Sequence, residues 1–372
     1  MEIYYDYKNL PPFTKNEFNL ENWQKEAPGI LELFKNEVYG EIFDSASIKV
    51  SFRVAEQKSG FMENRAIRKI IEVSVKRNGM EFSFPFYLFL PNGAEKKPVP
   101  VFISLLNFSM SDGDPSRYRL SQFWPAEMLV SRGYGAAAVF ANEIASDFDE
   151  GFSSKFYRLF PEIAGKRPAN TGGSIASWAW GMSRVVDYLL SDPCVNGKEI
   201  AVVGHSRGGK TSLWCGVQDA RVALVVSSCS GCSGTAITRG KTGERIGNIT
   251  TRFPYWFCEN YAKYANQEDT MPFDQHMLLA LIAPRLLYIS GRSYDSWCDP
   301  KAEFLSLKNA SSVFNLYSKG DLSNIEMPMP EKGFVKGNIG YHLKSGEHGM
   351  EEYDWERFIN FADMHFNPLG NN

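Results

Sequence analysis

Ser206 stands at the centre of a Gly-x-Ser-x-Gly pattern, Gly204 to Gly208, within the stretch AVVGHSRGGK. The apolar residues before Gly204 predict a buried strand, and residues 210–219 predict a helix. A serine on a tight strand-to-helix turn needs small neighbours. Its hydroxyl then stands above the sheet at a helix N-terminus, where backbone N–H groups can bind an oxyanion. The pattern therefore predicts a nucleophilic serine.

A nucleophilic serine needs a general base, and the chain offers five histidines: His205, His276, His342, His348 and His365. In a site of this kind the histidine follows the acid along the chain, after the last strand. The first two histidines come too early, and His365 lies in a predicted closing helix. His342 follows an aromatic residue in a strand-like run, which indicates a structural role. His348 lies in a glycine-rich loop, and we expect it to be the base.

The segments around these residues predict the elements that must position them. Three antiparallel strands are expected first, with an Asn-Gly hairpin turn between the last two: 47–57, 68–77 and 80–91. Further strands are expected at 99–106, 134–144, 199–204, 222–231, 285–295 and 314–321. Helices that alternate with them are expected at 121–133, 174–192, 210–219, 274–283, 301–312 and 351–366.

This alternation predicts an α/β-hydrolase: a three-layer sandwich with a mostly parallel central sheet and antiparallel N-terminal strands. We expect one catalytic domain over residues 1–372, with its core at about 95–368. The long irregular stretches 145–173 and 233–270 are expected to carry function, since loops of that length in a compact domain usually do.

Composition and charge exclude several other classes of protein. The chain of 372 residues is 44% hydrophobic and 22% charged, with a net charge of −3, so neither nucleic acid nor an anionic membrane is an expected partner. No apolar run is long enough to span a bilayer, and MEIYYDYKNL lacks the pattern of a signal peptide. The six cysteines show no paired metal pattern, and the single CxxC at 229–232 is a weak redox signal.

Several longer motifs resemble carbohydrate esterase family 15, the glucuronoyl esterases, in its bacterial branch. They follow in the family's order over about residues 95–365: GHSRGGK, SGCSG, FPYWFCENYAKY, DQHMLLALIAPR, YDSWCDPKAEFLS and EHGM. The resemblance implies a metal-free and cofactor-free α/β-hydrolase that cleaves methyl or lignin-alcohol esters of 4-O-methylglucuronic acid on glucuronoxylan. It also implies a secreted or periplasmic enzyme, and we expect a monomer whose partner is a carbohydrate.

The acid of the triad is where the chain departs from the family. In much of the family a glutamate follows the strand after the nucleophile, but here Cys229 takes that place, and a thiol cannot orient an imidazole as a carboxylate does. A second family position for the acid corresponds to Asp295, at the end of the strand 285–295. We assign Asp295 as the acid, with Asp299 as its rival. Asp299 precedes a proline and suits the N-cap of the next helix, and Glu347 is the candidate after both.

Four further residues are expected around the substrate. The backbone N–H of Arg207 points into the oxyanion site, and the resemblance implies that its guanidinium does so too. The resemblance also implies that Lys210 and Glu244 bind sugar hydroxyls and that Trp297 provides an apolar face for the pyranose. The alternatives are a solvated first-turn lysine, a loop carboxylate and a core tryptophan. Cys232 and Cys258 match two cysteines common in bacterial members, and their pairing stays open.

Three other functions remain open at this point. An acetyl-xylan esterase or other carbohydrate carboxylesterase would attack acetyl groups carried by the sugar rather than an acyl group that is the sugar. A peptidase of the prolyl-oligopeptidase type should have a β-propeller gate, and no such repeats appear. A sugar-binding pseudo-hydrolase is supported only by the missing glutamate.

Overall fold

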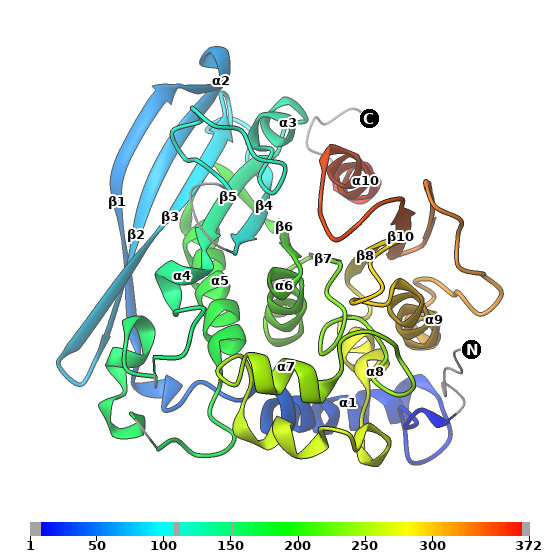
Figure 1. Cartoon of the computed structure of the whole chain (residues 1–372). Coiled ribbons are helices and arrows are strands. Elements are labelled where there is room, and N and C mark those ends of the chain that lie inside the picture. Colours follow the sequence, from blue (N-terminus) through cyan, green and yellow to red (C-terminus); the bar gives the residue numbers. More distant parts are fainter. Residues whose placement is uncertain (1–8, 108–111, 151, 165, 367–372) are drawn as a thin grey trace.

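The described part of the chain forms one ten-stranded mixed sheet with the strand order β1-β2-β3-β5-β4-β6-β7-β8-β10-β9 (Figure 1). The computed structural model describes residues 9–107, 112–150, 152–164 and 166–366. The strands are β1 (Lys49–Gly60), β2 (Ala66–Arg77), β3 (Met80–Pro91), β4 (Val99–Leu106), β5 (Gly135–Phe140), β6 (Val195–His205), β7 (Leu224–Ser228), β8 (Leu286–Arg292), β9 (Lys332–Lys336) and β10 (Ile339–Lys344).

The six central strands, β5, β4, β6, β7, β8 and β10, are parallel. Every residue of β4, β5, β7 and β8 is buried. Strands covered on both faces read as nearly continuous apolar runs, and for this reason the sequence predicted them well. The predicted mostly parallel central sheet is confirmed.

The N-terminal strands β1, β2 and β3 are antiparallel, as predicted, and β3 joins them to β5. Asn78 and Gly79 have φ values of 48° and 82° between β2 and β3. Positive φ at both central residues is the requirement of a type I′ hairpin turn, which an Asn-Gly pair satisfies. β1 is the edge strand and most of its residues are exposed.

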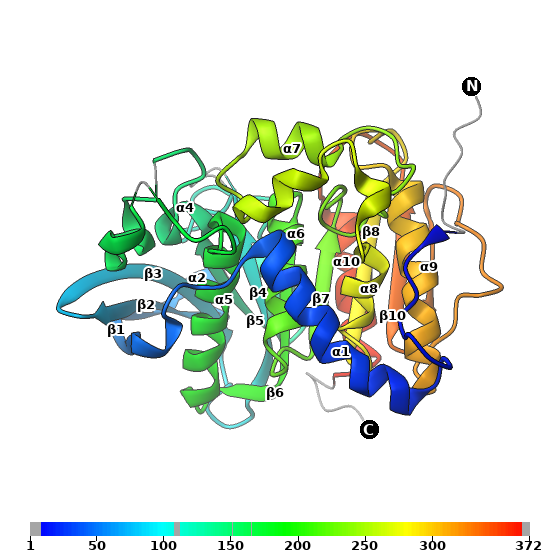
Figure 2. The ribbon, with the colours of Figure 1, turned by 90° about the horizontal axis from the view of Figure 1, so that it is seen from below.

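Helices cover both faces of the sheet and complete the predicted three layers (Figures 1 and 2). One buried cluster includes Trp214 and Phe304 and joins the sheet to five helices: α1 (Leu20–Phe34), α5 (Ser174–Ser191), α6 (Arg207–Gln218), α8 (Gln275–Ala280) and α9 (Pro300–Leu316). The other includes Leu129 and Trp355 and joins it to α3 (Ala126–Ser131) and α10 (Glu352–Asp363). In Figure 2, α1 crosses in front of the strands and α10 lies behind them.

Short elements fill the connections, and no helix in the described ranges combines the length and the apolarity needed to cross a membrane. The connecting helices are α2 (Phe61–Asn64), α4 (Ala141–Ile144) and α7 (Ile246–Arg252). In the described parts of the two long stretches expected to be irregular, the only helices are α7 and short 3₁₀ helices.

Some predictions about the elements were wrong, and one helix was not predicted. The strand expected at 314–321 does not form, because α9 continues through Leu316 and buries Phe314 in the core. The last strands are instead β9 and β10. The helix α1 was not predicted, since Pro28 and Gly29 interrupt its pattern. The helix expected at 121–133 begins only at Ala126, directly after a proline.

Candidate active site

Ser206 occupies a strained turn between β6 and α6. Its backbone has φ 59° and ψ −120°, a combination that is uncommon outside glycine. The Ser206 N–H donates to the Ser228 carbonyl at 2.9 Å, and the Ser206 carbonyl accepts from the Lys210 N–H at 3.1 Å. A Cβ at Gly204 would lie 1.9 Å from the Gly208 carbonyl oxygen, so this position requires glycine. The turn has the form expected of a nucleophile elbow.

His348 and Asp295 meet at the same edge of the sheet. Asp295 follows β8 and His348 follows β10, and these strands are parallel neighbours. His348 Nδ1 lies 2.6 Å from Asp295 Oδ2, and Asp295 Oδ1 accepts from the Cys298 N–H at 3.0 Å. Although burial by itself raises the pKa of Asp295, hydrogen bonds from His348 and Cys298 lower it below its usual value. The structure thus provides an ionised carboxylate that can fix the imidazole tautomer.

Asp299 caps the helix that follows it. Its Oδ1 accepts from the Ala302 N–H at 3.1 Å, which confirms its predicted role as the N-cap of α9. Its Oδ2 accepts from the backbone N–H and the hydroxyl of Thr242, at 2.8 and 3.0 Å. Glu347, the third candidate acid, is exposed. Among the three carboxylates, the contact with His348 favours Asp295.

His342 forms a second histidine–aspartate pair inside the protein. Its Nε2 lies 2.8 Å from Asp354 Oδ1, and its Nδ1 lies 3.1 Å from the Tyr288 hydroxyl. The side chain is fully buried on β10, and burial lowers the pKa of His342 despite its hydrogen bond to Asp354. These contacts match the structural role that the sequence indicated.

His205 packs against the candidate base. Its ring centroid lies 4.5 Å from that of His348 and 5.4 Å from that of Phe123. Burial and the neighbouring His348 hold the pKa of His205 well below its usual range. A neutral ring in this place supports the imidazole of His348 without adding charge. The remaining histidines lie elsewhere: His276 Nε2 is 3.0 Å from the Pro11 carbonyl oxygen, and His365 packs on Phe361 beyond the end of α10.

Arg207 is held by a residue that the sequence did not single out. Its guanidinium forms an ion pair with Asp147, which also accepts from Trp256 Nε1 at 2.7 Å. The guanidinium carbon lies 4.8 Å above the Trp256 ring. Asp147 lies within the irregular stretch 145–173. The unusual length of that stretch was the only feature of the sequence that could have indicated a functional residue there. Burial raises the pKa of Asp147 although the Arg207 charge opposes the shift.

Lys210, Glu244 and Trp297 lie close together. Lys210 Nζ donates to the Ser230 carbonyl at 2.6 Å and lies 3.9 Å from Glu244 Oε2, and the Glu244 N–H donates to the Trp297 carbonyl at 2.9 Å. Lys210 is 3% exposed, so the alternative of a solvated lysine is wrong. Trp297 is 47% exposed, so the alternative of a core tryptophan is wrong as well.

The cysteines, all within the described ranges, are free thiols. The open question of Cys232 and Cys258 is thereby answered for this structure, in which they do not pair. Cys232 Sγ lies 3.5 Å from the Ser233 hydroxyl, and Cys258 Sγ donates to the Asn36 carbonyl at 3.5 Å.

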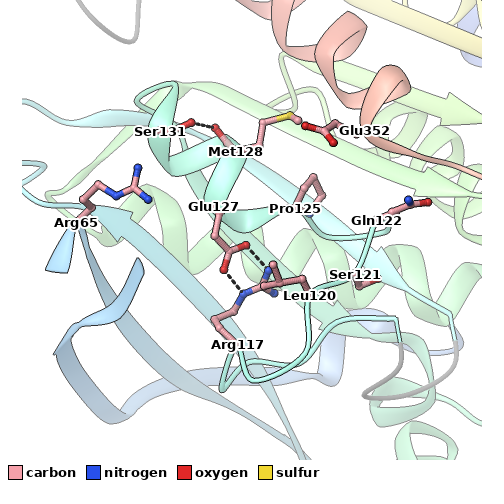
Figure 3. A pocket seen from close by; sticks show the side chains of 10 residues that line it. All are labelled: Arg65, Arg117, Leu120, Ser121, Gln122, Pro125, Glu127, Met128, Ser131 and Glu352. Atoms are coloured by element: carbon pink, nitrogen blue, oxygen red, sulfur yellow. Dashed lines mark hydrogen bonds and ion pairs between the residues drawn. The ribbon is translucent and has the colours of Figure 1, made fainter. Parts of the chain in front are cut away.

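A separate surface pocket of about 480 Å³ contains none of the predicted site residues (Figure 3). Two of the residues that line it, Arg117 and Glu127, form an ion pair, with Arg117 Nε 2.8 Å from Glu127 Oε1. Glu352, on the opposite side in the figure, begins α10 shortly after the His348 loop. The candidate catalytic residues lie at the carboxyl ends of β6, β8 and β10, and Cys229 lies at the end of β7; none of them lines this pocket.

Comparisons with known proteins bear on the family and the fold of the chain. A family profile described as "Glucuronyl esterase, fungi" matches residues 73–318. The carbohydrate esterase MZ0003, from an unknown prokaryotic organism, is 34% identical over 92% of this chain and 84% of its own. The profile match includes Ser206 and Asp295 and ends before His348.

A fungal enzyme and a solved bacterial structure give further matches. The 4-O-methyl-glucuronoyl methylesterase 1 of Phanerochaete chrysosporium is 27% identical over 68% of this chain and 51% of its own, so the chain spans about half of that enzyme. The structure of a glucuronoyl esterase from Solibacter usitatus has a TM-score of 0.86 at 34% identity, over 97% of this chain and 98% of that one.

Proposed function

The chain belongs to the glucuronoyl esterase family, carbohydrate esterase family 15, and from this premise we propose that Ser206, His348 and Asp295 form the triad with which it hydrolyses esters of 4-O-methylglucuronic acid. The resemblance noted from the sequence motifs is confirmed by the family profile. The single observation that carries the triad is the 2.6 Å contact between His348 Nδ1 and Asp295 Oδ2, beside the strained turn at Ser206. The substrate class follows the names of the fungal relatives.

The reaction begins with the Ser206 hydroxyl. Its Oγ attacks the C6 carbonyl of the uronate ester while His348 accepts the hydroxyl proton, and Asp295 stabilises the resulting imidazolium. The negative charge that develops on the carbonyl oxygen faces the Arg207 N–H at the start of α6, where the helix dipole is favourable. The tetrahedral intermediate collapses, the alcohol leaves with the proton from His348, and a glucuronoyl-enzyme remains.

Water completes the cycle. His348 takes a proton from the water molecule, whose oxygen attacks the acyl carbon of the glucuronoyl-enzyme. Collapse of the second tetrahedral intermediate returns the proton to Ser206 Oγ and releases the uronic acid.

The proposed role of Asp295 also removes the support for a sugar-binding pseudo-hydrolase. That alternative depended on the cysteine that replaces the family's usual acid.

Lys210, Glu244 and Trp297 are proposed to bind the sugar. In a glucuronate ester the sugar is the acyl group, so the pyranose must lie beside the serine. Lys210 and Glu244 are both nearly buried, and they offer a donor and an acceptor for hydroxyl groups. The half-exposed indole of Trp297 offers an apolar face to the ring.

The test of the proposed function is hydrolysis of benzyl glucuronate beside an acetylated xylan, with Ser206→Ala as the control. We expect turnover of the uronate ester and little release of acetate. Acetate release without uronate-ester turnover would replace the proposal with a carbohydrate acetylesterase.

Several properties of the whole protein belong to the same proposal. The continuous sheet supports a single catalytic domain over residues 1–372. A polysaccharide of the plant cell wall as substrate favours a secreted or periplasmic enzyme, and we propose that it acts as a monomer.

Lys210→Ala and Trp297→Ala are expected to weaken hydrolysis of glucuronate esters more than hydrolysis of a plain aryl acetate. Loss of a hydrogen bond to a charged group or of a stacking face should lower kcat/KM for the uronate by about ten- to a hundredfold. Tyr294→Ala is the matched control, because Tyr294 is an exposed aromatic residue nearby with no proposed sugar contact. Equal losses on both substrates would contradict a role in sugar recognition.

Asp147→Asn is expected to lower kcat about tenfold or more with little change in KM. The substitution removes the charge that fixes the Arg207 guanidinium, and a misplaced donor stabilises the developing oxyanion less. Asp187→Asn is the control, since Asp187 pairs with Arg221 at the surface. A rise in KM at constant kcat would show instead that Asp147 acts on substrate binding.

A further inference from the structure

Cys229 provides a sulfur atom beside the candidate triad that the proposed reaction does not use. Its Sγ, a carboxylate oxygen of Asp295 and a ring nitrogen of His348 all lie within 4.8 Å of one another. Cys229 directly follows β7, the strand that lies between β6 and β8. The three side chains therefore converge from three separate strand ends.

The separations are close to those of a metal site. Ligands around tetrahedral zinc, with bonds of about 2.0–2.3 Å, are about 3.3–3.6 Å apart. The Asp295 and His348 atoms would have to separate by about 0.7–1 Å from 2.6 Å, and the sulfur, within 4.8 Å of both, would have to approach by up to about 1.2–1.5 Å. Shifts of this size are within the reach of side-chain rotations and of a small loop movement.

The loop that bears His348 has room to make this adjustment. A Cβ added at Gly346 would meet nothing within 4 Å, so there is open space beside this point of the loop, although the Gly346 carbonyl accepts from the Tyr294 N–H at 3.0 Å. The His348 side chain is 41% exposed, which gives an ion a path from solvent. Cys229 is fixed more firmly, because its N–H donates to the Ser290 carbonyl at 2.9 Å and its side chain is buried.

The donor types suit a thiophilic cation. Thiolate, imidazole and carboxylate are the ligand classes that zinc takes in proteins. The thiolate and the carboxylate together balance the charge of a divalent ion in this buried place. A second sulfur, Cys298 Sγ, lies 3.6 Å from His348 Nδ1 and is a candidate for the fourth position.

We propose that Cys229, Asp295 and His348 form a binding site for a thiophilic divalent cation such as zinc, and that occupation of this site reversibly inhibits the enzyme. The bound ion replaces the hydrogen bond between His348 and Asp295, so the imidazole loses the partner that orients it. Its positive charge also opposes protonation of the ring. Burial raises the pKa of the Cys229 thiol well above its usual range, so binding must displace the thiol proton into solvent.

Cobalt(II) tests the site without reference to catalysis, because thiolate-bound cobalt absorbs in the near ultraviolet. We expect the full chain to develop this band on titration with cobalt, and excess zinc to abolish it. Inhibition rests on the proposed function, so it is measured separately: zinc should lower esterase activity at least tenfold, and EDTA should restore it. If the protein shows no esterase activity, the cobalt band still decides whether the site binds metal.

Variants at two cysteines, Cys229 and Cys232, make the test specific. Cys229→Ser should lose the band and bind zinc at least tenfold more weakly by calorimetry, while its esterase activity without metal stays near wild type. Cys229→Ala repeats the test if the serine variant is poorly folded. Cys232→Ser, which changes a buried thiol outside the cluster, should behave as wild type. Absence of the band in the wild-type protein, or an unchanged band in both Cys229 variants, would overturn the proposal.

Cys298→Ser reports on the fourth position. A weaker band and weaker zinc binding would add Cys298 to the ligands. An unchanged band would leave the three-ligand site in place, with water as the fourth ligand. The cobalt band of Cys298→Ser is compared with that of Cys229→Ser in both cases. The proposal requires that Cys229→Ser loses the band.

Discussion

Ser206→Ala is expected to abolish hydrolysis of glucuronate esters while the protein stays folded. The substitution removes only the Oγ, and the backbone contacts that hold the turn, to Ser228 and Lys210, do not involve the side chain. Loss of a triad nucleophile commonly lowers kcat by about 10⁴-fold or more. Steady-state kinetics with benzyl glucuronate measure the effect, and circular dichroism checks the fold.

A matched serine variant separates this effect from that of losing any hydroxyl. Ser131→Ala removes an exposed hydroxyl on α3 that donates to the Met128 carbonyl at 2.8 Å, and it should leave kcat unchanged. Residual turnover by Ser206→Ala above about a thousandth of wild type would indicate another nucleophile.

The site could be predicted from sequence where local constraints are strong. The turn at Ser206 requires glycine at Gly204, because its backbone approaches Gly208 too closely for a side chain. The parallel strands could also be predicted, since burial on both faces makes most of their residues apolar. His348 followed from chain order and from the glycines around it, and the structure places it beside Asp295.

The rest depends on contacts between distant parts of the chain. Asp147 meets Arg207 across 60 residues from an irregular segment, and no local pattern predicts such a pair. The choice between Asp295 and Asp299 depends on the turn after β8, which directs the first toward His348 and the second toward the start of α9. The error at 314–321 has a similar cause, because packing of Phe314 in the core extends α9 through residues that also suit a strand.

Cys229 shows how the site accommodates a change at its usual acid. A thiol whose pKa is raised well above its usual range by burial stays neutral, so it cannot replace a carboxylate in stabilising an imidazolium. Asp295 approaches His348 from the neighbouring strand end and provides the charge. The sheet thus offers two adjacent positions from which an acid can reach the same imidazole, and we propose that this chain uses the one that follows β8.

Asp295→Asn is expected to lower kcat for glucuronate esters by about 10²–10⁴-fold, because an amide in place of the carboxylate holds His348 in the wrong tautomer. Asp299→Asn is the matched control, four residues along the chain. It should leave kcat near wild type and cost about 1 kcal/mol or less of stability through the cap of α9. Kinetics and thermal unfolding of both variants distinguish the two roles, and the reverse outcome would make Asp299 the acid.

A rescue variant tests whether the loss is that of a carboxylate beside His348. Cys229 Sγ lies within 4.8 Å of the ligand atoms of Asp295 and His348, so a longer glutamate side chain at 229 can reach the imidazole. Cys229→Glu combined with Asp295→Asn should therefore recover at least tenfold of the lost kcat, whereas Cys229→Gln in the same background should recover none. Recovery with both side chains would mean that hydrogen bonding alone orients His348. If Asp295→Asn has no effect, Glu347 becomes the candidate acid, and Glu347→Gln should then carry the loss.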